Sequence, residues 1–161
     1  MAHTTQDIIR TLARDGLIWR AEHSALAVPA GASTYLGFVT GDNELEALSR
    51  SYSSTGNALV VELFEASFTG GTPAHTINRR LSHAGPPPVQ LLTGITPGAL
   101  GDAITAVRIL APTSTGSAQA GVSADDSLLL LKAQTSYVLR ISNTGASAAD
   151  LGAAIDYRES I

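Results

Sequence analysis

Beyond residue 16 the chain is patterned as a series of short strands. Runs of β-branched, aromatic and aliphatic residues alternate with turn formers. In the run 137–141, Tyr137, Leu139 and Ile141 alternate with Val138 and Arg140. Side chains two residues apart share one face of a strand, so one face can enter a core while the other meets solvent. This pattern predicts an all-β fold, an antiparallel sandwich or barrel.

The strands are expected between clusters of Gly, Asn, Asp and Pro, which supply turn conformations. Residues 128–131 are four leucines in succession, apolar on both faces. This run is typical of a strand buried between a core and a neighbour, with a short buried helix as the alternative. The candidate strands are residues 17–27, 34–40, 47–53, 58–67, 89–92, 103–110, 127–133, 136–142 and 149–158.

The first residues have a different period. Ile8, Ile9 and Leu12 recur at helical spacing behind Thr and Asp residues suited to an N-cap, and Gly16 supplies a stop. A short helix at 5–15 is therefore expected, dividing the chain into an arm (1–16) and a β-sandwich domain (17–161). So short a helix needs a docking surface. It packs either on a partner or on its own sandwich.

Two further features are candidates for partner contacts. Trp19 is the only tryptophan, and it can anchor either the domain's own core or a partner's pocket. Residues 69–88 are rich in Gly, Pro and Thr and predict a long loop. Within it, Arg79 and Arg80 are suited to bidentate pairing with carboxylates of another chain, although a solvated pair is the simpler reading.

Composition narrows the functional classes. The 161 residues suit one domain, and the net charge of −4 with a single lysine disfavours nucleic-acid binding. The chain lacks cysteine, which excludes disulfides and zinc thiolates and is compatible with cytoplasmic assembly. Neither a signal peptide nor a membrane span is expected. The sparse charge favours an oligomer, or a protein that lives on another protein's surface.

No motif for chemistry is visible. The chain lacks a phosphate-binding GxxxxGK[ST] sequence, an HExxH pair, a spaced calcium loop and a G-x-S-x-G elbow. The histidines, His3, His23, His75 and His83, show no metal-ligand spacing. We therefore expect neither an enzyme nor a bound cofactor or metal.

Two segments carry a family resemblance. The run Ala58-Leu-Val-Val-Glu-Leu-Phe-Glu-Ala66, followed by Gly70-Gly-Thr-Pro73 and Asn78-Arg-Arg80, resembles the capsid decoration, or cement, proteins of tailed bacteriophages. The later Leu131–Asn143 stretch, with its Tyr-x-Leu-Arg-Ile core, is similar to the same family and occurs in the same order. The resemblance covers roughly residues 34–157.

The resemblance implies a jelly-roll sandwich that binds the outer surface of the phage head as a symmetric homo-oligomer. A dimer suits a capsid twofold and a trimer a threefold position; the sequence does not decide between them, and we favour the trimer. Its partner would be the major capsid protein, its place the virion surface after synthesis in the host cytoplasm. No catalytic residues come with that family. The candidate contact residues, from our own interpretation, are Ile8, Ile9, Leu12, Trp19, Arg79 and Arg80.

The alternative is a glycan- or receptor-binding β-sandwich of a phage tail or surface structure. Sugar binding relies on aromatic side chains in exposed loops. Aromatic residues are 5% of this chain, and none occurs from Thr69 to Ser136. This distribution disfavours the alternative.

Overall fold

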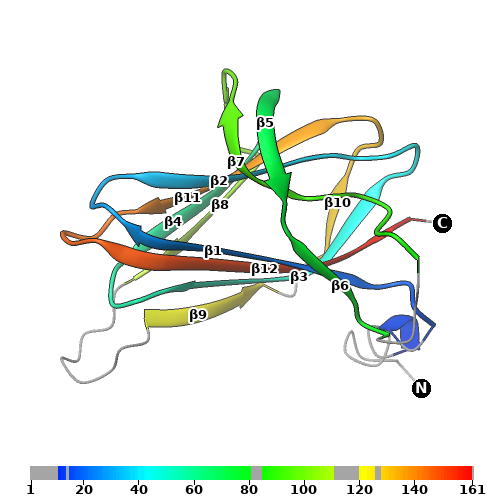
Figure 1. Ribbon diagram of the computed structural model, residues 1–161, viewed down its shortest axis with the longest axis horizontal. Coiled ribbons are helices and arrows are strands. Elements are labelled where there is room, and N and C mark those ends of the chain that lie inside the picture. Colours follow the sequence, from blue (N-terminus) through cyan, green and yellow to red (C-terminus); the bar gives the residue numbers. More distant parts are fainter. Residues whose placement is uncertain (1–10, 14, 81–84, 111–119, 126–127, 161) are drawn as a thin grey trace.

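The computed structural model describes residues 11–13, 15–80, 85–110, 120–125 and 128–160. Its described part contains twelve strands in two antiparallel sheets that pack face to face (Figure 1). One helical turn, residues 11–13, precedes them. The predicted fold class, an all-β sandwich with a minor helical element at its start, is confirmed.

Each sheet has six strands. The first, sheet A, has the order β10–β3–β12–β1–β6, with β9 also on β3. The second, sheet B, has the order β5–β7–β2–β11–β4–β8. The strands of sheet A are β1 (Trp19–Val28), β3 (Leu45–Ser54), β6 (His75–Asn78), β9 (Ala120–Asp125), β10 (Leu129–Leu131) and β12 (Ala149–Glu159). Those of sheet B are β2 (Ser33–Val39), β4 (Leu59–Glu65), β5 (Phe68–Pro73), β7 (Leu92–Pro97), β8 (Thr105–Ile109) and β11 (Ser136–Asn143).

The connectivity is that of a jelly roll. The chain crosses from one sheet to the other between β1 and β2, between β3 and β4, and between β11 and β12. The central order β10–β3–β12–β1 in sheet A is matched by β8–β4–β11–β2 in sheet B. Strands that follow each other in the chain thus occupy matching positions in the two layers, the double Greek-key arrangement of jelly rolls.

The core lies between the sheets and follows the alternation of the strands. From β11 it receives Tyr137, Leu139 and Ile141, and from β12 Leu151 and Tyr157, all nearly inaccessible to solvent. Burying each such side chain contributes about 1.5–3 kcal/mol. Tyr157 also donates a hydrogen bond to Val89 O (2.7 Å), and burial raises the pKa of its phenol.

The segment 69–88 is not one long loop, contrary to the expectation from its composition. It contains most of β5 and all of β6, edge strands of different sheets. Gly71, with a φ of 106°, makes this possible, because a β-carbon there would lie 2.7 Å from Ile95 Cγ2. Edge strands tolerate Gly and Pro, which central strands do not. Two other errors are β7, expected at 89–92, and β9, which was not expected at all.

The outer face of β11 is partly covered. Val138 is fully buried because Phe68 and Ile95, from the ribbon formed by β5 and β7, pack over it together with Phe64. Gly37 leaves room for the ribbon, since an added β-carbon would lie 2.8 Å from Ile95 Cδ1. The run of four leucines, 128–131, was expected to be buried on both faces. Leu131 enters the core, but Leu128 and Leu130 are exposed.

His23 gives the sandwich a pH-dependent link. Its Nε2 lies 3.0 Å from Thr34 Oγ1, which joins β1 of sheet A to β2 of sheet B. Desolvation lowers the pKa of His23 from its ordinary value of 6.5. The unfolded chain therefore binds this proton more readily, and the stability that neutral His23 supplies is present above about pH 6.5 and lost as the pH falls below it.

We expect His23→Gln to remove part of the loss of stability between pH 7 and pH 5. The measurement is the free energy of unfolding in urea at several pH values, for both proteins. His75, which is exposed, is present in both proteins, so the difference between their pH slopes reports the effect of His23. Equal pH slopes for the two proteins would contradict this role of His23.

Candidate functional site

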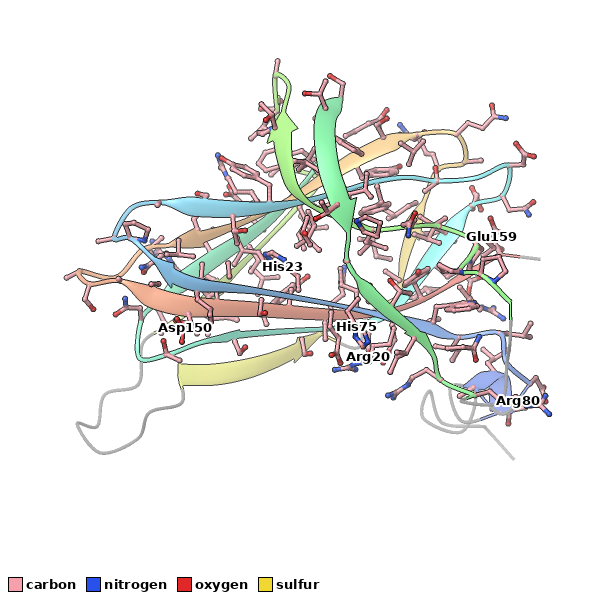
Figure 2. All side chains as sticks on the ribbon, in the orientation of Figure 1. Arg20, His23, His75, Arg80, Asp150 and Glu159 are labelled. Carbon is pink, nitrogen blue, oxygen red and sulfur yellow. The ribbon has the colours of Figure 1, made fainter. Side chains whose placement is uncertain are left out.

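The structure brings together residues that the sequence places about 60 positions apart. Arg79 N–H donates to Ile18 O (2.9 Å), and Asn78 Nδ2 donates to Gly16 O (2.8 Å). The helical turn and Arg80 therefore lie at the same corner of the molecule (Figure 2). We call this region the arm corner; it comprises Leu12, Gly16, Leu17, Asn78, Arg79 and Arg80.

The arm corner is built by a helix end and a strand pair. Leu17 N–H donates to Leu12 O and Gly16 N–H to Ala13 O, the two bonds of a Schellman motif. Gly16 takes the positive φ, 77°, that this motif requires. The predicted helix stop at Gly16 is thus confirmed. Trp19 is paired with Asn78 in the register of β1 and β6, which sets the helix end beside Arg79.

Arg79 of the corner and the nearby Arg20 both lie close to the carboxylate of Asp156. Asp156 is on the outer face of sheet A and is almost inaccessible to solvent. Arg79 Nε lies 3.6 Å from Asp156 Oδ1, and Arg20 Nη1 lies 3.5 Å from Asp156 Oδ2. Ser49 also donates to Oδ2 (2.9 Å). Asp156 was not among the residues predicted from the sequence; the available signal was a charged residue on the same outward face of its strand as Gly152 and Ala154.

The candidate contact residues have different positions. Arg80 is exposed, and its backbone N–H donates to Asn78 Oδ1 (2.8 Å). Arg79 is also exposed, but the carboxylate that it meets belongs to its own chain. Trp19 is 7% exposed and packs in the domain's own core, so it does not project toward a partner. Leu12 is half-buried, and Ile8 and Ile9 lie outside the described residues.

Two of the stretches that resemble the decoration proteins, residues 58–66 and the Tyr-x-Leu-Arg stretch, are neighbours in sheet B. The 58–66 run forms β4, which pairs with β11 from the Tyr-x-Leu-Arg stretch. Arg140 Nη2 lies 2.6 Å from Glu62 Oε2, and the Arg140 guanidinium is stacked 5.0 Å from the centre of the Phe64 ring. These residues join two central strands and stabilise the sheet.

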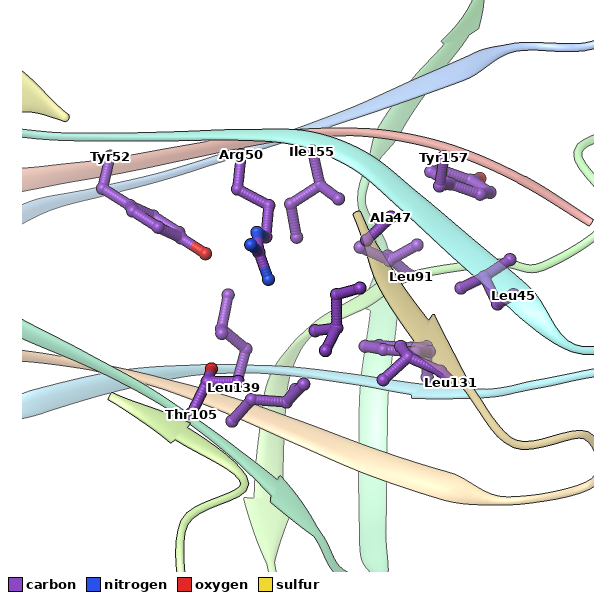
Figure 3. A pocket seen from close by; sticks show the side chains of 13 residues that line it. Leu45, Ala47, Arg50, Tyr52, Leu91, Thr105, Leu131, Leu139, Ile155 and Tyr157 are labelled. Atoms are coloured by element: carbon purple, nitrogen blue, oxygen red, sulfur yellow. The ribbon is translucent and has the colours of Figure 1, made fainter. Parts of the chain in front are cut away.

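Two hollows lie against the sheets in the part of the chain that the structure describes. Between the sheets, Arg50 reaches into an apolar cavity of about 30 Å³ (Figure 3), room for one or two waters only. A shallow trough of about 450 Å³ on sheet A is lined by small residues of β1, β3 and β12, together with Tyr52 and the side chains of Arg20, Glu22, His23 and His75. Among the described residues, no group of three or more His, Cys, Asp or Glu side chains is placed to hold a metal.

Comparisons with known proteins add likeness in fold. No family of known proteins and no curated protein matches the chain. It is similar to the K1 cleaved adhesin domain of Lys-gingipain from Porphyromonas gingivalis W83, with a TM-score of 0.47, 11% identity and coverage of 86% of this chain and 73% of that one. It is also similar to a mitogen derived from Yersinia pseudotuberculosis (0.38, 10%, 88% and 86%) and to a chain of sacbrood virus of honeybee (0.25, 10%, 89% and 70%).

In the part of the chain that the structure describes, no helix is long and apolar enough to cross a membrane.

Proposed function

We propose that the protein decorates the outside of a phage head, where it binds the major capsid protein and stabilises contacts between neighbouring capsid subunits. The observation that carries this proposal is the arm corner. Three of the candidate contact residues, Leu12, Arg79 and Arg80, come from distant parts of the sequence and lie together beside the helical turn. The family resemblance supports the same reading.

The jelly roll supplies a rigid body for such a clamp. The corner is joined to it by the β1–β6 pair and by the ion pairs of Asp156 with Arg20 and Arg79. A force on the corner is therefore transmitted to the central strands of sheet A. A clamp needs this rigidity and no reactive group, so we propose a structural role without catalysis or cofactor.

Avidity explains how one small corner can suffice. An oligomer that grips several capsid subunits makes each later contact intramolecular, which increases the overall affinity by about 10²–10⁴. Arg80 is an exposed residue of the corner and its charge suits a capsid carboxylate, and Leu17, which is 38% exposed, suits an apolar recess. The protein as a whole has a charge of −4, so a cationic corner also orients its approach to an acidic surface.

We expect Arg80→Glu to weaken binding to undecorated heads by about tenfold or more, because it places like charges against each other at the contact. Arg108→Glu is the matched control, since Arg108 is an exposed arginine on β8 and its replacement changes the net charge by the same amount. The measurement is co-sedimentation of purified protein with heads over a range of protein concentrations. Failure of the unaltered protein to sediment with heads, or equal losses for both variants, would contradict the proposal. A glycan array tests the sugar-binding alternative.

A further inference from the structure

In the part of the chain that the structure describes, the end of the sandwich opposite the arm corner contains three turns that carry no charge. They connect β1 to β2, β3 to β4 and β11 to β12, and they lie side by side at the left of Figure 1. Residues 26–32, 53–58 and 143–149 contain no Asp, Glu, Lys, Arg or His. We call these three segments, with Leu110 beside them, the uncharged end.

This end displays apolar side chains to solvent. Leu26 is 77% exposed and Leu110 is 72% exposed, the two highest values among the large apolar side chains of the described residues. Leu110 belongs here because it follows Ile109, which is paired with Leu59 at the start of β4. Pro29 and Ala30, which belong to the β1–β2 turn, are exposed as well. Leu26 belongs to β1 of sheet A and Leu110 follows β8 of sheet B, so this end offers an exposed leucine from each layer of the sandwich to a partner.

The three turns are held in one conformation by buried amides. Asn143 Nδ2 donates to Val28 O (2.9 Å) and to Ser147 O (2.8 Å), and Asn57 Nδ2 donates to Ser147 O (2.6 Å). The side chains thus join all three turns. A surface that is already ordered loses little entropy when it binds.

The backbone beside Leu26 is constrained as well. Ala27 has a φ of 50°, a left-handed conformation that is uncommon for alanine. It is held there because Ala27 N–H donates to Asp150 Oδ1 (2.8 Å), while Asp150 N–H donates to Thr55 Oγ1 (2.8 Å). The charge nearest to the turns, that of Asp150, is therefore engaged with the backbone. Leu26 is displayed by a strained turn that the surrounding bonds enforce.

We propose that the uncharged end is where copies of this chain join. Each copy carries a net charge of −4, so copies repel each other over most of their surfaces. The uncharged end is a place where they approach without this cost. An uncharged patch with apolar and hydroxyl-bearing side chains can meet the surface of another copy without repulsion between like charges, whether the copies form a dimer or a ring.

This inference deepens the proposed function and rests on it for its biological meaning. Copies joined at their uncharged ends hold their arm corners away from the shared contact, because the two regions lie at opposite ends of the sandwich (Figure 1). The oligomer then presents one corner per copy, each free to grip a capsid subunit. The contact between copies thereby produces the multivalency that the clamp needs.

The test is the mass of the protein in solution, measured by sedimentation equilibrium over a range of concentrations. The unaltered protein should form an oligomer, and Leu26→Glu should raise its dissociation constant by about tenfold or more, because a carboxylate would replace an apolar side chain and lose its hydration in the contact. Leu110→Glu should act in the same direction. Leu130→Glu is the matched control, since Leu130 is also an exposed leucine (51%) but lies on β10; it should leave the mass unchanged.

A monomeric unaltered protein at the highest concentration measured would overturn the inference, as would dissociation by Leu130→Glu alone. Thermal melting of each variant shows that the fold is retained. Head binding is read separately. An oligomer that is broken by Leu26→Glu but does not bind heads supports the contact between copies and contradicts the decoration function, whereas head binding by a monomer does the reverse.

Discussion

Replacement of Asn143 by alanine is expected to destabilise the fold by about 3 kcal/mol, because each buried polar group left without a partner costs roughly 1–3 kcal/mol. Asn143 is completely buried where the three turns of the uncharged end meet. Its Nδ2 donates to Val28 O and Ser147 O, and its Oδ1 accepts from Gly145 N–H (3.0 Å). Alanine would leave Val28 O buried without this side-chain partner and Gly145 N–H without its acceptor, whereas Ser147 O would keep its bond from Asn57 Nδ2.

Urea unfolding at neutral pH measures this effect. Asn143→Asp keeps the acceptor for Gly145 but turns a carboxylate oxygen toward the carbonyl oxygens of Val28, Pro29 and Ser147, so it should be at least as destabilising as alanine. Thr144→Ala changes the next residue, which is exposed, and should have an effect within about 0.5 kcal/mol. A loss below about 1 kcal/mol for Asn143→Ala would show that the turns do not depend on this side chain.

Deletion of residues 1–15 is expected to abolish detectable attachment to heads while leaving the sandwich folded. The bonds from the corner to β6 begin at Gly16 O and Ile18 O, which the deletion keeps. Thr11, Leu12 and Ala13 accept backbone bonds only from residues 15–17 among the bonds described here. The helical turn therefore contributes little to the hydrogen bonding of the sandwich, whereas loss of one contact in every copy removes the avidity of the oligomer.

Thermal melting and co-sedimentation with heads separate the possible results. A truncated protein that no longer folds would show that the arm packs on its own sandwich as part of the core. A folded protein that binds heads normally would exclude the arm from the contact. The Arg108→Glu variant again serves as the control for head binding, because it alters a distant surface of the same sandwich.

The strands that could be predicted are those with a clear period and strong turn formers at both ends. In β11, the alternation of Tyr137, Leu139 and Ile141 predicted the core face correctly. The other face was predicted to meet solvent, yet Val138 is buried, because the ribbon that covers it comes from residues that are distant in the sequence. The alternation of apolar residues along a strand shows which side chains share a face, but not which other part of the chain packs against that face.

The edge strands could not be predicted. Residues of β5 read as a loop because glycine and proline disfavour strands, but at an edge a single neighbour, β7, is enough to order them. Residues of β9 lack a recognisable strand pattern, and the strand exists because β3 offers it a hydrogen-bonding partner. Trp19 had two possible roles in the sequence, and the packing of the sheets around it decided for the core.

By itself the sequence determined the fold class, most of the central strands and the helix stop at Gly16, because periodicity, turn chemistry and glycine conformations act over a few neighbouring residues. Only the tertiary structure decided which distant residues meet. It placed Arg79 beside Asp156, set Arg80 next to the arm, and drew three uncharged turns together around Asn143 at the opposite end. Such contacts depend on the order in which strands pair across two sheets, a long-range property that no local pattern contains.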